Sequence, residues 1–306
     1  MKKESNEISS NIITFQLEEA HTGMELKEIL YEQMRLSSRL VRKLKRKKSI
    51  FVNDNRISFH AKLRKGDLVK IIMEEEPNQF EPEDIPIEVV YEDVDLLIVN
   101  KQPGIVVHPT KGHPTGTMAN AIVYYMKEKK QNFKIRFVNR LDRDTSGLII
   151  IAKNPFAQQE LSKQMQENRI EKIYLAVVKG DVENHEGTIC EPIGRPDTEE
   201  IRRRVYEEGQ RSVTHYKVVN RLKGGTVLRI KLETGRTHQI RVHMSYIGYP
   251  IFGDELYGYV DENLIKRQAL HAEMLSFYQP RTNDRVEIKA SVPKDIEELI
   301  EKLSYR

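Results

Sequence analysis

Residues 138–153 constrain the fold of this chain most strongly, because a charged loop runs there directly into a strand without polar positions. The stretch begins Val-Asn-Arg-Leu-Asp-Arg-Asp, passes through Thr-Ser-Gly and continues as the apolar run 148–152. Such a run is typical of a strand that is buried on both faces of its sheet. Since charged side chains are rarely buried without partners, an aspartate on the rim of that sheet indicates a site of chemistry. Asp142 is therefore the first candidate for a functional residue.

The remaining patterns predict an α+β fold with a mixed, mainly antiparallel β-sheet. The later part of the chain is mainly strands that do not alternate regularly with helices, which excludes a wound βα fold. At 306 residues the chain is long for one hydrophobic core, so we expect two or more domains. We predict strands at 87–91, 96–100 and 172–180, a strand, loop and strand within 136–153, and helices at 118–127, 157–167, 237–247 and from 294.

The sequence pattern of residues 12–73 predicts a small, basic N-terminal α/β domain. The expected elements are a helix at 24–34, a helix from the Ser37-Ser38 cap to about Lys47, a hairpin of strands 49–52 and 56–58, and a strand at 68–73. The acidic, proline-rich composition of residues 74–86 predicts a linker. The larger domain is then expected to span 87–306.

A basic cluster lies in the second expected helix, with eight Lys and Arg residues and no acidic residue between Arg35 and Lys48. On so small a unit the cluster favours a phosphate-binding face, and the alternative is a solvated helix face. The residues expected to bind phosphate are Arg39, Arg42, Lys43, Lys45, Arg46, Lys47 and Lys48.

Composition and residue spacing limit the cellular compartments and the kinds of site that this chain can have. The single cysteine, Cys190, cannot form an internal disulfide, which favours a reducing compartment. No apolar stretch follows the first lysines as in a secretory signal, and the longest apolar run is too short for a bilayer. The histidines lack metal-binding spacing, and no glycine-rich phosphate loop occurs. We therefore expect a cytoplasmic protein that binds no membrane, no metal and no cofactor. We also expect a monomer without an obligate protein partner.

Several motifs resemble, in order, those of the RluA-type pseudouridine synthases. They occupy residues 91–109, 139–153, 172–180, 235–244, 253–258 and 270–272. The N-terminal part, with its Leu-Ser-Ser-Arg, basic helix and Leu-Arg-Lys-Gly-Asp-Leu-Val, is similar to an S4-type RNA-binding domain. The resemblance implies a pseudouridine synthase fold with an N-terminal S4-like domain. It also implies an enzyme that isomerises uridine in structured RNA, with large-subunit ribosomal RNA expected ahead of tRNA.

The resemblance assigns four catalytic residues. Asp142 is the expected carboxylate, and attack on C1′, addition to C6 and removal of the 2′ proton all stay open. A carboxylate that must stay ionised in a dry pocket needs a cationic partner, and Arg241 is expected to supply it. Arg140, placed with Asp142 on one face of a strand, would displace the target base. Tyr174 would offer its ring to the flipped uracil and its hydroxyl to a proton relay.

The roles of two further residues near Asp142, Asn139 and Asp144, are less directly indicated by the sequence. Asn139 stands where these synthases usually carry histidine, and an amide keeps a donor and an acceptor but does not titrate. We expect it to orient the loop. Asp144 is expected to cap the following turn rather than to act in catalysis. The competing hypothesis is a non-catalytic RNA-binding or ribosome-assembly factor on the same fold.

Overall fold

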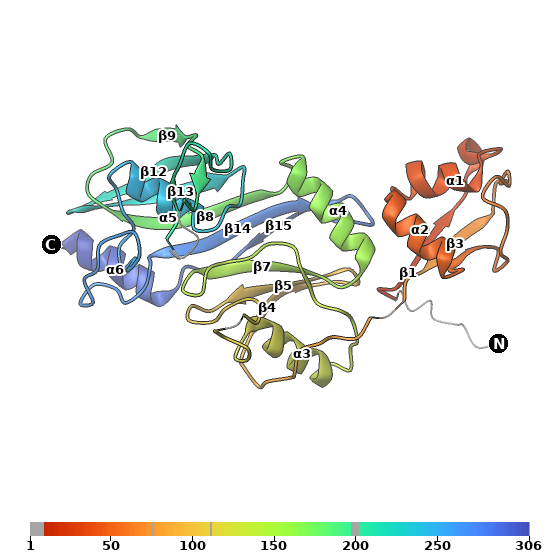
Figure 1. Ribbon diagram of the computed structural model, residues 1–306, viewed down its shortest axis with the longest axis horizontal. Helices are drawn as coiled ribbons and strands as arrows, with labels where there is room; N and C mark the ends of the chain where they lie inside the picture. Colours follow the sequence, from red (N-terminus) through yellow and green to blue (C-terminus); the bar gives the residue numbers. More distant parts are fainter. Residues whose placement is uncertain (1–8, 75, 111, 197–201, 306) are drawn as a thin grey trace.

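The structure, a computed structural model, describes residues 9–74, 76–110, 112–196 and 202–305. Two α+β units of unequal size lie side by side in it, the smaller one N-terminal (Figure 1). Among the described residues, no helix has both the length and the apolar composition needed to cross a membrane.

The small unit is a three-stranded antiparallel sheet covered by helices. Its elements are β1 (Ile12–Gln16), the short helix η1 (Glu19–His21), α1 (Leu26–Glu28) continued by the π-helical turn η2 (Ile29–Gln33), α2 (Ser38–Arg46), β2 (Ile50–Val52) and β3 (Leu68–Ile72), with the strand order β1-β3-β2. The Ser37 hydroxyl accepts a hydrogen bond from the amide of Leu40 and so caps α2. Helix α2 then buries Leu40, Val41 and Leu44 at helical spacing against the sheet.

The strand expected at 56–58 is wrong. Asn53 and Asp54 both have positive φ, and this tight turn is closed by paired backbone bonds between Val52 and Asn55. The side chain of Asn53 also accepts a hydrogen bond from the amide of Leu68. These contacts lead the chain toward β3, which becomes the partner of β2 in place of residues 56–58.

The large unit is built on a ten-stranded sheet. Its strands are β4 (Glu88–Glu92), β5 (Leu96–Lys101), β6 (Arg136–Phe137), β7 (Ser146–Ala152), β8 (Glu171–Lys179), β9 (Glu186–Ile189), β12 (Thr214–Leu222), β13 (Gly225–Leu232), β14 (Leu270–Tyr278) and β15 (Arg285–Lys289). The order is β4-β5-β7-β14-β8-β13-β12-β9, with β6 beside β7 and β15 beside β14. The strand pairs are antiparallel except β7 with β14. The prediction of a mixed, mainly antiparallel sheet is confirmed.

Four helices and a small ribbon complete this unit. They are α3 (Met118–Glu128), α4 (Pro155–Gln166), α5 (Gln239–Tyr246) and α6 (Lys294–Tyr305), and the ribbon pairs β10 (Ile193–Gly194) with β11 (Arg204–Val205). Helix α3 covers one face of β5 and β7, and α4 packs on the other (Figure 1). All seven residues of β7 are buried, as the apolar run 148–152 predicts.

Strand β7 begins with a close backbone approach to β14. Gly147 has a φ of +113°, and a Cβ at this position would lie 2.4 Å from the carbonyl oxygen of Ala272. Only glycine fits this conformation and spacing. The junction fixes the end of the charged loop that precedes β7.

Side-chain contacts join the two units. Phe156, in the first turn of α4, is 3% exposed and packs into the core of the small unit. The guanidinium of Arg281 binds the fully buried Asp95 at 2.8 Å and donates to the carbonyl oxygens of Ser9, Ser10 and Ile12. Because these contacts are specific and partly buried, they hold the small unit against α4.

Candidate active site

The charged loop between β6 and β7 borders a cavity of about 70 Å³. That volume is several times the roughly 10–15 Å³ that one water needs, so a small planar group has room to enter. Four expected residues line the cavity: Arg140 and Asp142 from the loop, Tyr174 from β8 and Arg241 from α5. The structure therefore brings together side chains that lie up to 101 positions apart in the sequence.

Arg140 and Asp142 lie in the loop and not on a strand, so the expectation that strand alternation brings them together is wrong. The loop conformation directs both to the cavity. The Asp142 carbonyl accepts a hydrogen bond from the amide of Thr145 at 3.2 Å, which closes a turn before β7. The exposed guanidinium of Arg140 donates to the hydroxyl of Thr237 at 2.6 Å and spans the mouth of the cavity.

The carboxylate of Asp142 is held by Arg241. The Nη1 atom of Arg241 lies 3.0 Å from Oδ2 of Asp142. Its Nε and Nη2 atoms bind both oxygens of Asp254, at 2.7 and 2.9 Å. Asp254 is fully buried and also accepts hydrogen bonds from the amides of Leu256 and Tyr257. Arg241 thus uses a fixed bidentate pair to present its third donor group to Asp142.

Electrostatics keep Arg241 charged and the neighbouring phenol of Tyr174 neutral. Burial by itself would lower the pKa of Arg241, but its hydrogen bonds and charge pairing with Asp254 and Asp142 raise it. The pKa of Tyr174 is also raised, mainly by burial and further by the charge of Asp142. Tyr174 therefore keeps its proton at neutral pH and can donate it in a hydrogen bond.

Helix α5 is anchored by polar side chains on either side of Arg241. The Gln239 amide donates to the carbonyl of Val213 and the hydroxyl of Thr214. The fully buried His243 bonds the same hydroxyl at 2.8 Å and the carbonyl of Glu191 at 2.9 Å. Gln239 and His243 therefore hold α5 in place, and Arg241, which lies between them in the sequence, faces the site.

Sequence reasoning missed His238 and Tyr257. His238 precedes α5 with a left-handed φ of +59°, and its Nε2 atom lies 4.0 Å from Oδ1 of Asp142. Its Nδ1 atom lies 2.9 Å from the Tyr257 hydroxyl. Burial lowers the pKa of His238, so the ring is neutral at neutral pH. Both residues stand inside motifs that the sequence analysis quotes, yet only the fold shows that the two motifs meet.

Residues 95–246 match the model of the RNA pseudouridylate synthase family, and residues 13–69 match the RluD ribosomal pseudouridine synthase N-terminal domain. The chain is 41% identical over 258 residues to the uncharacterized RNA pseudouridine synthase YlyB of Bacillus subtilis, covering 83% of this chain and 85% of that protein. It is 36% identical over 313 positions to ribosomal large subunit pseudouridine synthase D of Haemophilus ducreyi, covering 97% and 93%. The chain belongs to the RNA pseudouridylate synthase family.

A solved structure of the family supports the same fold. The human RNA pseudouridylate synthase domain containing 1 protein superposes with a TM-score of 0.55 at 29% identity, covering 67% of this chain and 83% of that one. The RluA-type resemblance and the predicted enzyme class, an RNA pseudouridine synthase, are therefore confirmed.

Asn139 serves the backbone in this synthase. Its amide nitrogen donates to the carbonyl of Leu148 at 3.1 Å, and its amide oxygen accepts from the amide of Ile150 at 2.8 Å. One side chain thus extends the hydrogen bonding of β7 and holds the loop that carries Asp142 beside it. These contacts agree with the expectation that Asn139 orients the loop, which stays a prediction.

Replacing Asn139 by alanine is expected to destabilise the protein by about 1–3 kcal/mol, because two backbone groups of β7 lose their partners. Thermal unfolding measures this loss. Activity measured well below the melting temperature should fall by less than about tenfold, since no proton transfer is removed. A rate that collapses while the melting temperature stays unchanged would contradict this orienting role.

Asp144 is not the turn ligand that the sequence suggests. Its carboxylate pairs with the guanidinium of Arg143 at 3.1 Å on the outer side of the loop. The amide of Thr145 is bound by the backbone carbonyl of Asp142. Because neighbouring backbone groups close the turn, the Asp144 side chain is left to pair with a cation.

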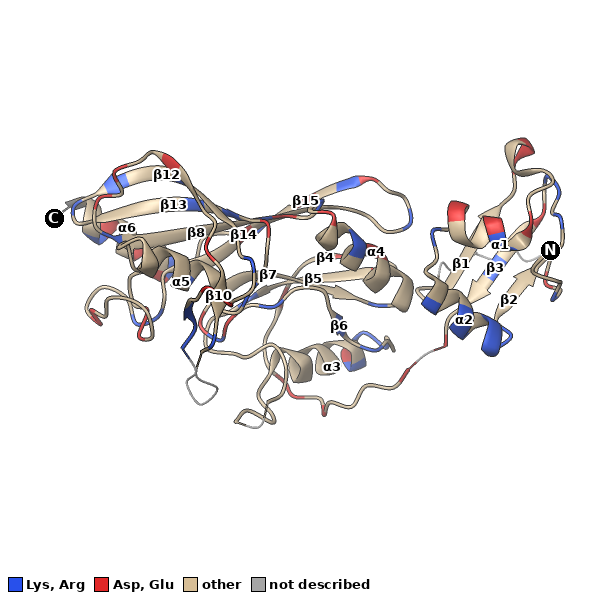
Figure 2. Ribbon diagram, turned by 45° about the horizontal axis from the view of Figure 1, so that its top comes forward, with Lys and Arg blue, Asp and Glu red and all other residues tan. Residues whose placement is uncertain are grey.

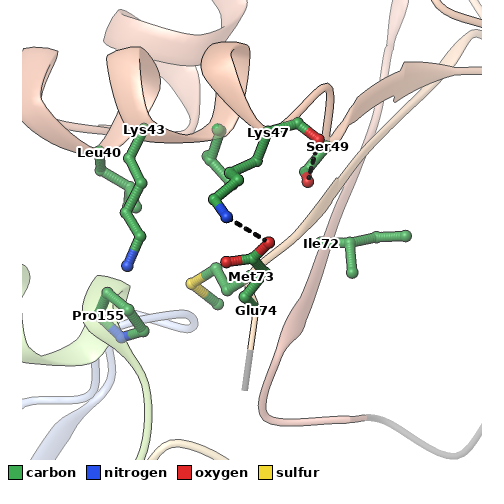
Figure 3. A pocket seen from close by; sticks show the side chains of 9 residues that line it. Leu40, Lys43, Lys47, Ser49, Ile72, Met73, Glu74 and Pro155 are labelled. Atoms are coloured by element: carbon green, nitrogen blue, oxygen red, sulfur yellow. Dashed lines mark hydrogen bonds and ion pairs between the residues drawn. The ribbon is translucent and has the colours of Figure 1, made fainter. Parts of the chain in front are cut away.

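The basic cluster lies on α2 and at its C-terminal end, and two of its seven expected residues meet carboxylates of the segment after β3. Lys47 pairs with Glu74 at 3.1 Å, and Figure 3 shows this ion pair beside the junction with Pro155. Lys43 binds Glu76 at 2.5 Å, and hydrogen bonds from Lys43 and then Lys134 lower the pKa of Glu76 to about 2. The other five are exposed: Arg39, Arg42, Lys45, Arg46 and Lys48. Figure 2 shows the basic end of α2 in blue.

Proposed function

We propose that this synthase converts uridine to pseudouridine in large-subunit ribosomal RNA, with Asp142 as the catalytic carboxylate. The observation that carries the proposal is the Asp142–Arg241–Asp254 arrangement at the cavity, which holds one carboxylate partly open and charge-paired. The choice of ribosomal RNA is supported by the N-terminal match and by the name of the Haemophilus ducreyi relative.

The reaction breaks the N1–C1′ bond, turns the uracil and joins C5 to C1′. The C5 proton leaves and N1 gains a proton, so the isomerisation needs no oxidant and no cofactor. Asp142 can act on C1′, on C6 or on the 2′ proton, and each role needs an ionised carboxylate beside the sugar. Arg241 keeps that carboxylate paired and oriented.

Two further residues handle the base. Arg140 reaches across the mouth of the cavity, where a guanidinium can fill the gap left in the RNA when the uridine flips out. Tyr174 presents a buried aromatic face and a neutral hydroxyl to the flipped uracil. This arrangement supports the proposed roles of Asp142, Arg140, Tyr174 and Arg241.

The basic face of α2 is proposed as the RNA anchor, and its five exposed cations support this role. We divide the chain into an S4-like RNA-binding domain at 12–73, a linker at 74–86 and a catalytic domain at 87–306. We also propose that the protein acts as a monomer without an obligate protein partner. The proposed compartment is the cytoplasm, in accord with a ribosomal RNA substrate.

Mass-spectrometric mapping of pseudouridine in ribosomal RNA and tRNA, with and without the gene, tests the proposal. At least one uridine of large-subunit ribosomal RNA is expected to lose its modification and to regain it when the gene is returned. A change confined to tRNA would assign the enzyme to tRNA. An unchanged map in both RNA classes would overturn the proposed function.

A further inference from the structure

A second depression is lined in part by Tyr257, whose hydroxyl contacts His238 beside Asp142. It has a volume of about 460 Å³ and runs between residues 202–205 and the C-terminal half of α5. Three consecutive arginines, 202–204, form one wall, and Ser245 and Tyr246 stand on the other. Figure 2 shows the basic segment in blue beneath α5 and beside β10. We call this depression the arginine groove.

The arginine groove is connected to the active site through Tyr257. The Tyr257 hydroxyl accepts a hydrogen bond from the amide of Arg203 at 2.6 Å and contacts Nδ1 of His238 at 2.9 Å. The guanidinium of Arg202 lies 5.4 Å from the Tyr257 ring centroid, and that of Arg241 lies 5.1 Å from it. One tyrosine therefore contacts both the groove and the residues around Asp142.

The described lining of the groove carries more basic than acidic side chains. No carboxylate is among the described residues that line it, whereas the basic helix α2 is partly neutralised by Glu74 and Glu76. The Nε atom of Arg203 is buried, and among the described residues it has no hydrogen-bond partner. A buried donor of this kind is costly unless something accepts from it, and a phosphate oxygen is a suitable acceptor.

An exposed aromatic ring stands beside these arginines. Tyr246 is 56% exposed, more than the other large apolar or aromatic side chains that lie open on the described surface. A tyrosine ring next to cations is the combination with which proteins hold single-stranded RNA, since the base stacks on the ring and the phosphate meets the cations.

We propose that the arginine groove binds the single-stranded RNA next to the target uridine. Arg202 and Arg203 would hold a phosphate, and Tyr246 would stack an unpaired neighbouring base. The proposal rests on the proposed function, because it takes RNA as the substrate of the Asp142 site. It adds that the substrate segment is unpaired beside the flipped uridine, since a base held in a duplex cannot stack on Tyr246.

The test uses the full chain and a fluorescent oligouridylate of about nine nucleotides, within the usual site size of single-strand binders. Arg202→Gln is expected to weaken binding and to reduce the salt slope of log K by about 0.7, the value for one lost phosphate contact. Tyr246→Ala is expected to weaken binding by about 5-fold to 100-fold with an unchanged salt slope, and Tyr246→Phe should bind like the parent. Arg202→Lys should restore most of the salt slope.

Two variants on the surface outside the groove serve as controls for binding. Arg285→Gln on β15 and Val219→Ala on β12 remove exposed side chains outside the groove and should leave binding unchanged. Photocrosslinking with 4-thiouridine in the same oligonucleotide should label the peptide that contains Tyr246, which separates this site from α2. The inference is overturned if the groove variants bind like the controls at an unchanged melting temperature, or if crosslinks occur on α2 alone. Failure to find a modified ribosomal uridine would refute the proposed function and leave this binding result standing.

Discussion

Replacing Asp142 by asparagine is expected to lower the rate of pseudouridine formation by at least about 10⁴-fold, because the ionised carboxylate is the group that acts at the sugar or the base. The amide has nearly the same size, and its oxygen can still accept the hydrogen bond that Arg241 donates at 3.0 Å. RNA binding should therefore change by less than about threefold. Release of tritium from C5 of labelled uridine measures the chemical step under single-turnover conditions.

Asp144→Asn is the matched control for this variant. Asp144 lies two positions further along the same loop, but its carboxylate pairs with Arg143 outside the cavity. Its loss should change the rate by less than about tenfold, since it removes only a surface ion pair. If Asp142→Asn kept a rate close to that of Asp144→Asn, the catalytic role of Asp142 would be wrong, and an RNA-binding role would account for the protein.

The sequence predicts elements well where local pattern decides them. The apolar run 148–152 becomes the buried strand β7, and the Ser37-Ser38 cap marks the start of α2. Local pattern fails where a distant partner decides. The segment 56–58 is expected to pair with β2, but after the Asn53-Asp54 turn β2 pairs instead with β3, a strand about 15 positions further along the chain.

The same distinction between local pattern and distant partners applies to the residues of the candidate site. Motif resemblance indicates Asp142 and Arg241, which lie 99 positions apart, but no local signal shows that Asp254 fixes Arg241 from the other side. The contact of Phe156 with the core of the small unit is equally invisible in the sequence, because an apolar residue early in α4 fits its own sheet as well. Such partners are determined by tertiary packing, which a single sequence does not display.

Replacing Arg241 by methionine is expected to cost both stability and activity. Asp254 is fully buried, and loss of its bidentate partner would leave an uncompensated charge, which typically costs about 3–5 kcal/mol. The same change removes the cation that orients Asp142. Arg241→Lys keeps the charge, but an ammonium cannot make the fork that binds Asp254 and reach Asp142 as well. It should therefore recover part of the stability and little of the rate.

The double variant Arg241→Met/Asp254→Leu separates the two effects. Apolar side chains in place of a buried ion pair are often neutral or stabilising, so the melting temperature should recover. The recovery should be partial, because Asp254→Leu also removes the acceptor for the amides of Leu256 and Tyr257. The rate should stay reduced by at least about 100-fold, because Asp142 still lacks its cationic partner. Chemical denaturation and single-turnover tritium release on the same preparation supply both values. If activity returned together with stability, Arg241 would act only through folding, and Asp142 would need no cation to do its chemistry.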